Sequence, residues 1–447
     1  TYNCLGFSIE IHQSLDIEKW HQSLQLISDE EPVLRTKIVT NQIYFADSGY
    51  QCVLKKMPVH FEFLNWESIV SNQEELKQKT SKLVYKTIDI VNQNILENYL
   101  IKLNKQHFIM ICAGHHIAID GTGGALILQR ICQKYESLLN NETDKSVLSQ
   151  PYQEYIEFNL KYFDNASAIE QWKHRFQHVE PLDMPVLPKL HERSISIKKS
   201  IKKEDFGKIK KYCRQQGLTI PLLFKTIYGL VLSRYCRSQS DFIVFEPLAG
   251  RIRNHQKSIG CYYHQLPFIF PEHLLSADIP LKELYGYIKS FLRSLGNHRY
   301  ISLFQQSQLI PASRIQFYYN FYSFKADLSL FGQASQMKVY HPLFLEDQVH
   351  LLVSTKQDDL VLNLLYNSAH FTDFELLERI ASVALQLTEN KQTIGEISFL
   401  LDNEVKYFDH LKIKKSEENT LSLAQHFSQI ATKSPDAIAV SSEDKTL

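Results

Sequence analysis

Residues Ala113–Leu128 read AGHHIAIDGTGGALIL, and this stretch decides the fold. The apolar run Gln106–Cys112 precedes the two histidines, as expected of a strand covered on both faces. After them, Gly124–Leu139 carries apolar side chains at helical spacing, namely Ile127, Ile131, Tyr135 and Leu138. The stretch is therefore predicted to hold the loop between a central strand and a helix.

Ionisable groups gather at this corner. Side chains alternate along a strand, so His115 and His116 are expected to point to opposite faces and only one of them to reach a shared site. One turn of the loop would bring His116 close to Asp120 as an i, i+4 pair. Gly121 and the pair Gly123–Gly124 would let the backbone turn and approach a neighbouring group.

The residue types at the corner favour proton transfer, and each also has a simpler interpretation. An imidazole with a pKa of ~6.5 exchanges a proton at neutral pH, which suits a general base for an amine or alcohol nucleophile. In the simpler interpretation, a histidine on a strand is a hydrogen-bonded core residue. Asp120 before Gly121 then forms a turn, and GTGG is the start of a helix. A metal site at His115, His116 and Asp120 is disfavoured, because the histidines face apart and no third ligand is local, so no metal is expected.

Composition and missing motifs exclude several classes of protein. The 447 residues include 49 Lys+Arg and 49 Asp+Glu, which argues against nucleic acid or an anionic membrane as the main partner. No window approaches ~18 uncharged apolar residues and no signal peptide is evident, so neither a membrane span nor secretion is expected. Seven scattered cysteines without a CxxC pair fit a reducing, cytoplasmic setting. GTGGAL lacks the third glycine of GxGxxG and the lysine of a phosphate loop, and there is no GxSxG elbow.

Three prolines in 180–188 (EPLDMPVLP) mark a linker between two lobes. The predicted N-terminal lobe is 1–179 and the C-terminal lobe is 189–416. Residues 417–447 are too short to bury an apolar face of their own and are expected to open a truncated neighbouring domain. The strands expected along the chain are Leu5–Ile11, which alternates, Asp241–Glu246, Arg314–Phe324 and His350–Ser354. The helices expected are Ile17–Ile27, Glu204–Gln216, which Gly217 ends, a further helix that Thr219 caps, and Asp373–Thr388.

A family resemblance rests first on HHIAIDG, which has the pattern HHxxxDG. With this motif the chain resembles condensation domains of nonribosomal peptide synthetases, in the chloramphenicol-acetyltransferase-like superfamily. Thr420–Leu447 is similar to the opening of an adenylation domain. Further segments that resemble the family are Pro32–Thr36 (PVLRT), Pro151–Tyr155 (PYQEY), Asp241–Arg251 (DFIVFEPLAGR), Ser258–Pro267 (SIGCYYHQLP) and the neighbourhood of Tyr319 and Asn320.

The chain departs from the family pattern at several places, among them Glu154, where an aspartate is usual. Glu31 stands where a histidine is usual, and His264 with Gln265 replaces an Asn-Thr pair. The family's opening SxAQxxLW-like segment is absent, so we expect the chain to start inside the fold or to have lost its beginning. The replacement at His264 and Gln265 bears on substrate preference more than on fold.

The resemblance implies an α/β (α+β) fold of two chloramphenicol-acetyltransferase-like lobes in a V shape with a tunnel between them. It also implies amide formation, in which a carrier-bound aminoacyl amine attacks a carrier-bound acyl or peptidyl thioester. No cofactor is expected to bind directly, because carrier-protein domains deliver the phosphopantetheine arm. The partners implied are an upstream donor carrier domain, a downstream acceptor carrier domain and the adjoining adenylation domain.

The resemblance also assigns roles to residues of this chain. His116 would position or deprotonate the amine, and Asp120 would form a buried salt bridge with Arg251. The Gly121 backbone N–H would lie near the oxyanion, although a need for positive φ explains Gly121 more simply. His115 is expected to pack away from the tunnel. The residues expected to line the tunnel are Tyr263, His264 and Asn320.

Two questions stay open: whether the domain is of the starter type, and whether it forms an amide at all. Asn297–Tyr300 (NHRY), followed by Phe304 and Gln305, resembles the HxRY run of starter-type domains, which favours an acyl-loading module over an elongation step. The alternatives are a same-fold epimerisation or ester-forming domain, and a non-catalytic platform that recruits a carrier or a modifying enzyme. The sequence carries no EGHGRE-like or DFGWG segment, which disfavours epimerisation and the plant-type acyltransferases.

Overall fold

The computed structural model divides the chain into two compact units, Thr1–Phe399 and Leu400–Leu447, which are described separately. The division falls before position 416, the predicted end of the C-terminal lobe. The structure describes residues 4–40, 49–86, 88–91, 93–143, 148–162, 166–182, 194–235, 240–295, 301–311, 316–322, 328–335, 337–340, 348–369, 371–372, 375–411, 422–438, 441–442 and 445–446.

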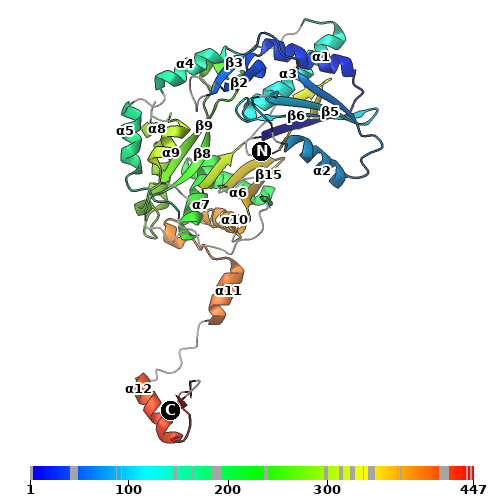
Figure 1. The fold of residues 1–447 in the computed structure, drawn as a ribbon. Coiled ribbons are helices and arrows are strands. Elements are labelled where there is room, and N and C mark those ends of the chain that lie inside the picture. Colours follow the sequence, from blue (N-terminus) through cyan, green and yellow to red (C-terminus); the bar gives the residue numbers. More distant parts are fainter. Residues whose placement is uncertain are drawn as a thin grey trace. The chain divides into compact units, whose positions relative to one another are not determined.

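The first unit contains a five-stranded sheet with the order β13-β1-β6-β5-β4. Its strands are β1 (Cys4–Ile11), β4 (His60–Asn65), β5 (Leu96–Asn104), β6 (His107–His115) and β13 (Met337–Tyr340). Helices α1 (Ile17–Glu30) and α3 (Gly121–Asn140) cover one face of this sheet, and α2 (Gln73–Val84) lies on the other (Figure 1). Strand β13 comes from the second half of the chain and pairs antiparallel with β1, so the two halves share one sheet.

Strand β1 is buried on both faces. Phe7 and Ile9 belong to the core under α1 and α3, while the opposite face packs beside Val84 and Tyr340. Ser8 is buried too, and its hydroxyl donates to Tyr340 Oη at 3.5 Å. The strand predicted at Leu5–Ile11 is confirmed, but Ser8 lies under a second layer instead of facing solvent, while Glu10 near the end of the strand is exposed.

A six-stranded sheet with the order β7-β15-β14-β10-β8-β9 forms the rest of the main core. Its strands are β7 (Ser194–Ile201), β8 (Phe242–Ala249), β9 (Tyr263–Phe270), β10 (Gln316–Phe321), β14 (Gln348–Lys356) and β15 (Asp359–Asn367). The helices that pack on it are α6 (Lys203–Gln216), α7 (Ile220–Tyr235), α8 (Leu281–Leu295) and α10 (Leu376–Leu387). The fold is thus mixed α/β, as predicted.

Local signals set the ends of these helices. Gly217 ends α6 in the left-handed conformation with φ 57°, and the Thr219 hydroxyl accepts a bond from Leu222 N at 3.4 Å at the start of α7. The helices predicted over Glu204–Gln216 and after Thr219 are confirmed. Part of the predicted linker 180–188 lies outside the described residues.

Shorter elements complete the first unit. The helices are α4 (Tyr152–Tyr162), α5 (Ala166–Phe176) and α9 (Leu303–Leu309), and the strands are β2 (Thr36–Thr40), β3 (Gly49–Val53), β11 (Leu328–Leu330) and β12 (Gln333–Ser335). Short 3-10 turns are η1 (Pro32–Arg35), η2 (Arg253–His255), η3 (Glu272–Leu274) and η5 (Ile394–Glu396).

The second unit holds α11 (Asp402–Leu411), α12 (Leu423–Lys433) and two short strands, β16 (Ser441–Ser442) and β17 (Lys445–Thr446). Ser422 and Gln425 form a capping box at the start of α12. Leu423, Phe427 and Ile430 on this helix are exposed, because a segment of this size has no core to receive them. Strands β16 and β17 pair antiparallel.

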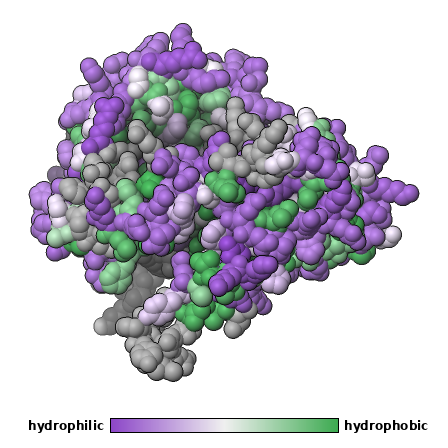
Figure 2. Space-filling model, turned by 90° about the horizontal axis from the view of Figure 1, so that it is seen from above, coloured by the Kyte–Doolittle hydropathy of each residue, from purple (hydrophilic) through white to green (hydrophobic). Residues whose placement is uncertain are grey.

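No single helix among the described residues has the length and apolar character needed to cross a membrane. Helices α6 and α7 meet the length and composition criteria only as a pair, with a bend of 97° between them. Figure 2 shows a face on which hydrophilic side chains predominate and apolar side chains form separate patches.

The contact of α3 with β1 depends on Gly124. A Cβ atom there would lie 2.2 Å from the ring of Phe7, which is fully buried. We predict that Gly124→Ala lowers the free energy of unfolding by about 1–3 kcal/mol, because the ring cannot retreat. Urea unfolding measures the change.

Gly207→Ala is the matched control. Gly207 also lies within a helix, but a Cβ there meets nothing within 4 Å, so the substitution should be neutral or stabilise by up to ~1 kcal/mol. Equal losses in the two variants would contradict the role assigned to Gly124.

Candidate active site

The corner after β6 is built around Asp120. Strand β6 ends at His115, α3 begins at Gly121, and Asp120 is the N-cap residue between them. Its Oδ1 accepts a hydrogen bond from Gly123 N at 2.7 Å, which satisfies one of the free amides of the first turn. The Asp120 carboxylate therefore caps the start of α3. This cap fixes the position of the loop that precedes the helix.

Asp120 also contacts the segment between β8 and β9. Arg251 Nη1 donates to Oδ2 at 2.6 Å and Nη2 donates to Oδ1 at 2.8 Å, so the pair is bidentate. Tyr262 N donates to Oδ2 at 3.0 Å. Both side chains are buried, with 3% of Arg251 and 8% of Asp120 exposed. The salt bridge that the resemblance implies is thus present, and it links segments that belong to the two different sheets.

Glycine is required opposite the corner, at Gly260. This residue has φ 154°, and its carbonyl accepts from Asp120 N at 3.2 Å. A Cβ at Gly123 would lie 2.9 Å from the same carbonyl oxygen, so both backbones approach closely. Gly121 has helical φ, as the first residue of α3, so the expectation that it needs positive φ is wrong.

His116 lies next to this salt bridge and contacts the other half of the chain. Its Nδ1 is 3.8 Å from Cys261 Sγ, and its ring centroid is 5.5 Å from that of Tyr263. Burial lowers the pKa of His116 below its ordinary value of 6.5, against smaller opposing effects of its own backbone carbonyl and of Asp120. The imidazole is therefore mainly neutral at pH 7, the form that accepts a proton. Burial raises the pKa of Cys261 to about 11, so its sulfur is a thiol.

His115 has different partners. Its Nδ1 accepts a hydrogen bond from Ile117 N at 3.2 Å, inside its own loop. Burial lowers the pKa of His115, and the neighbouring His116 lowers it further. Asp120 forms its hydrogen bonds with Gly123, Arg251 and Tyr262, so the expected i, i+4 pairing with His116 is at most electrostatic.

A cluster of tyrosines and histidines surrounds the segment that carries Cys261. Tyr152 Oη donates to Cys261 O at 2.6 Å, and Tyr155 Oη lies 2.5 Å from His264 Nε2. Tyr155 also packs against Tyr262, with ring centroids 4.5 Å apart. Cys261 and these tyrosines were not among the candidate site residues, although they lie inside the two segments quoted for the resemblance.

Asn320 lies on β10. Among the described residues, no contact joins it to His116. Its strand neighbour Tyr318, on the same face, donates to Gln265 Oε1 at 3.3 Å and stacks on His350 with ring centroids 4.4 Å apart. Tyr263 Oη also reaches Gln265 Oε1, at 3.5 Å. A polar row thus runs from Tyr263 toward β10, while a tunnel lined by Tyr263, His264 and Asn320 stays a prediction.

The departure at Glu31 and the starter-like run Asn297–Tyr300 have different outcomes. Glu31, where a histidine is usual in the family, is buried in an ion pair with Arg130 and accepts from Ser149 N at 3.3 Å. Its role here is structural support beneath α3. The run Asn297–Tyr300 lies outside the described residues, and Phe304 of α9 is exposed.

Comparison with known proteins identifies the family. The condensation domain model matches residues 2–300. Gramicidin S synthase 2 of Brevibacillus brevis is 23% identical, over 98% of this chain and 10% of its own length. The first condensation domain of the CDA synthetase superposes with a TM-score of 0.74 at 15% identity, covering 90% of this chain and 94% of that one. The starter condensation domain of rhizomide synthetase, as a mutant, gives 0.73 at 18% identity, with 90% and 92% covered.

The chain therefore belongs to the condensation domain family, and it is homologous to condensation regions of nonribosomal peptide synthetases. It spans about 10% of the length of the curated relatives that it matches first. At these identities the solved structures establish the fold.

The burial of His116 predicts its titration. Its pKa should lie below 6.5 in the folded protein, and protonation should favour the unfolded state, so His116 lowers stability as pH falls below 6.5. An NMR titration of the ring, assigned by its loss in His116→Gln, measures this. A midpoint at or above 6.5 would show that an anionic partner outweighs burial.

Proposed function

We propose that this domain forms an amide bond between two carrier-bound substrates. The amine of an aminoacyl group attacks the carbonyl carbon of an acyl or peptidyl thioester. The new C–N bond forms as the C–S bond breaks, and the donor arm leaves as a thiol that takes up the proton lost by the amine. The observation that carries the proposal is a neutral, partly buried His116 held beside the Asp120–Arg251 pair.

A thioester needs little further activation, so the main task is to align the two substrates. Alignment of bound reactants is worth ~7–11 kcal/mol in favourable cases. His116 would orient the amine and accept its proton through the ring nitrogen that faces away from Cys261. The N-terminus of α3, starting at the Gly121 amide, would favour the negative charge that develops on the carbonyl oxygen.

Asp120 and Arg251 act on this chemistry only by holding the corner. Each oxygen of the carboxylate accepts two hydrogen bonds within the protein, from Arg251, Gly123 and Tyr262. This leaves the carboxylate poorly placed to exchange a proton during turnover. We assign the proton transfer to His116 and a turn-stabilising role to His115.

The partners proposed are carrier domains and an adenylation domain. Phosphopantetheine arms would enter with the donor and acceptor carriers, so no resident cofactor is proposed. The relatives matched are far longer than this chain, and a four-domain nonribosomal peptide synthetase matches all of it. The exposed apolar residues of α12 fit the start of a following domain. We place the protein in the reducing cytoplasm, where the free thiols of Cys4, Cys112 and Cys261 persist.

The direct test supplies the chain with an acyl carrier protein donor and an aminoacyl carrier protein acceptor and detects the amide by mass spectrometry. His116→Ala should lower the rate about 100-fold or more, because the proton acceptor is lost. His174→Ala is the control, since this histidine is exposed on α5. Circular dichroism confirms that each variant is folded.

The outcomes separate the alternatives. A folded His116→Ala variant that forms the amide at the rate of the unmodified chain would contradict the assignment of His116 as the proton acceptor. Exchange of the aminoacyl α-proton in deuterated water, without amide, would indicate epimerisation instead. Carrier binding without turnover across a broad panel of acyl and peptidyl donors would indicate a recruitment platform. Preference for acyl over peptidyl donors would identify the starter type.

A further inference from the structure

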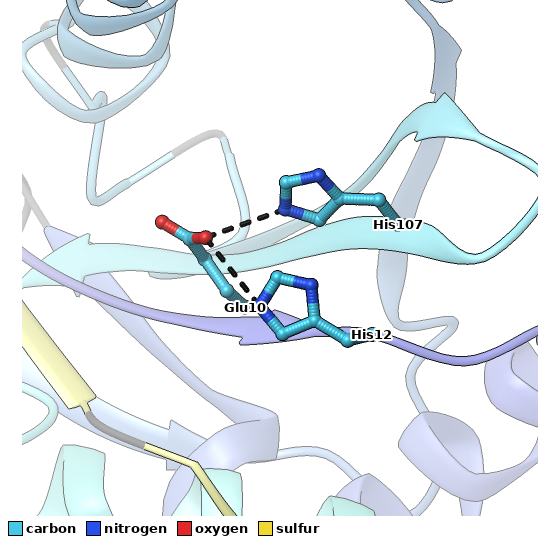
Figure 3. Close-up of side chains that lie close together, drawn as sticks. All are labelled: Glu10, His12 and His107. Carbon is cyan, nitrogen blue, oxygen red and sulfur yellow. Dashed lines mark hydrogen bonds and ion pairs between the residues drawn. The ribbon is translucent and has the colours of Figure 1, made fainter.

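Two histidines and a glutamate lie close together where β1 ends and β6 begins (Figure 3). His115, at the active-site corner, is at the opposite end of β6. Glu10 Oε2 is 3.3 Å from His107 Nε2 and 3.9 Å from His12 Nε2. The two imidazole centroids are 4.6 Å apart. One ligand atom from each residue lies within 4.8 Å of the others, so the three can converge on one point.

Strand register produces this arrangement. Ile11 pairs with Phe108, so His12, one residue further on, faces His107 across the sheet. Glu10 and His12 are two residues apart and share one face. Glu10 pairs with Ile109 of β6, and His107 pairs with Asn104 of β5. The backbone at Glu10 and His107 is therefore held by the sheet before any ligand arrives.

The donor set suits a particular class of ion. Imidazole nitrogen and carboxylate oxygen bind Zn²⁺ and neighbouring divalent transition metals at about 2.0–2.1 Å, which places tetrahedral ligand atoms roughly 3.3 Å apart. The separation of Glu10 from His107 already has this value. His12 is 64% exposed, so its ring is free to turn the short distance that remains.

Space for a fourth ligand adjoins the cluster. Glu10 and His12 line a hollow of about 450 Å³, together with Ser8, Gln13 and Lys338. The Lys338 ammonium lies 4.5 Å from the centroid of the Tyr340 ring, which stabilises this positive charge. A water molecule or a small anionic ligand would complete the coordination from the hollow.

We propose that Glu10, His12 and His107 bind one divalent transition-metal ion of the zinc class, with the fourth position open. His107 begins β6 and His115 ends it, so roughly 27 Å of strand separates this site from the active-site corner. The metal site is independent of the condensation chemistry and ties the end of β1 to the start of β6.

The test uses the full chain without a polyhistidine tag, stripped with a chelator and then dialysed. Isothermal titration with Zn²⁺ should show one site per chain, and Co²⁺ should give the visible absorption of a low-symmetry site. Glu10→Gln, His12→Ala and His107→Ala should each weaken Zn²⁺ binding about tenfold or more. The double variant His12→Ala/His107→Ala should lose the site.

The control is His273→Ala, which removes an exposed histidine from η3 and should leave Zn²⁺ binding unchanged. Thermal unfolding in the presence of chelator should be alike for all variants, because the cluster is at the surface. The proposal is overturned if the unmodified chain takes up neither ion, or if the double variant binds Zn²⁺ as tightly as His273→Ala does.

Discussion

Asp120 and Arg251 are two opposite charges held almost out of contact with water, on segments that belong to different sheets. Removing such charges from solvent is costly unless their hydrogen bonds are made within the protein. The carboxylate obtains its bonds from the guanidinium, from the first turn of α3 and from Tyr262 N. Asp120 therefore starts a helix and joins two halves of the chain. Loss of either Asp120 or Arg251 leaves the other as a buried charge without its partner.

The same constraint divides the tasks at the corner. Asp120 is saturated by hydrogen bonds and His115 is bonded to Ile117 N, so His116, which contacts Cys261 in the second half of the chain, is left as the proton acceptor of the motif. Its burial next to Cys261 and Tyr263 keeps it neutral at pH 7. Catalysis by alignment has little need of a strong base, so a weakly basic imidazole in a fixed place suits the reaction proposed.

The sequence predicted the strand-to-helix corner and most core helices, because hydrophobic periodicity and capping residues act over a few positions. The Asp120–Arg251 pair came from family resemblance, since spacing alone does not show which arginine is near. Contacts between segments far apart in the sequence could not be predicted: β13 beside β1, Cys261 beside His116, and His12 opposite His107. Gly121 was misjudged because the close approach at the corner is made by Gly260, on a distant segment.

A double-mutant cycle on Asp120 and Arg251 tests the central claim most directly, with urea unfolding of the unmodified chain, Asp120→Ala, Arg251→Ala and the double variant. Each single variant should lose about 3–5 kcal/mol, and the double variant should lose clearly less than their sum, because no charge is then stranded. Losses that add to within about 0.5 kcal/mol would contradict the account, since they would mean that the two side chains stabilise the fold independently.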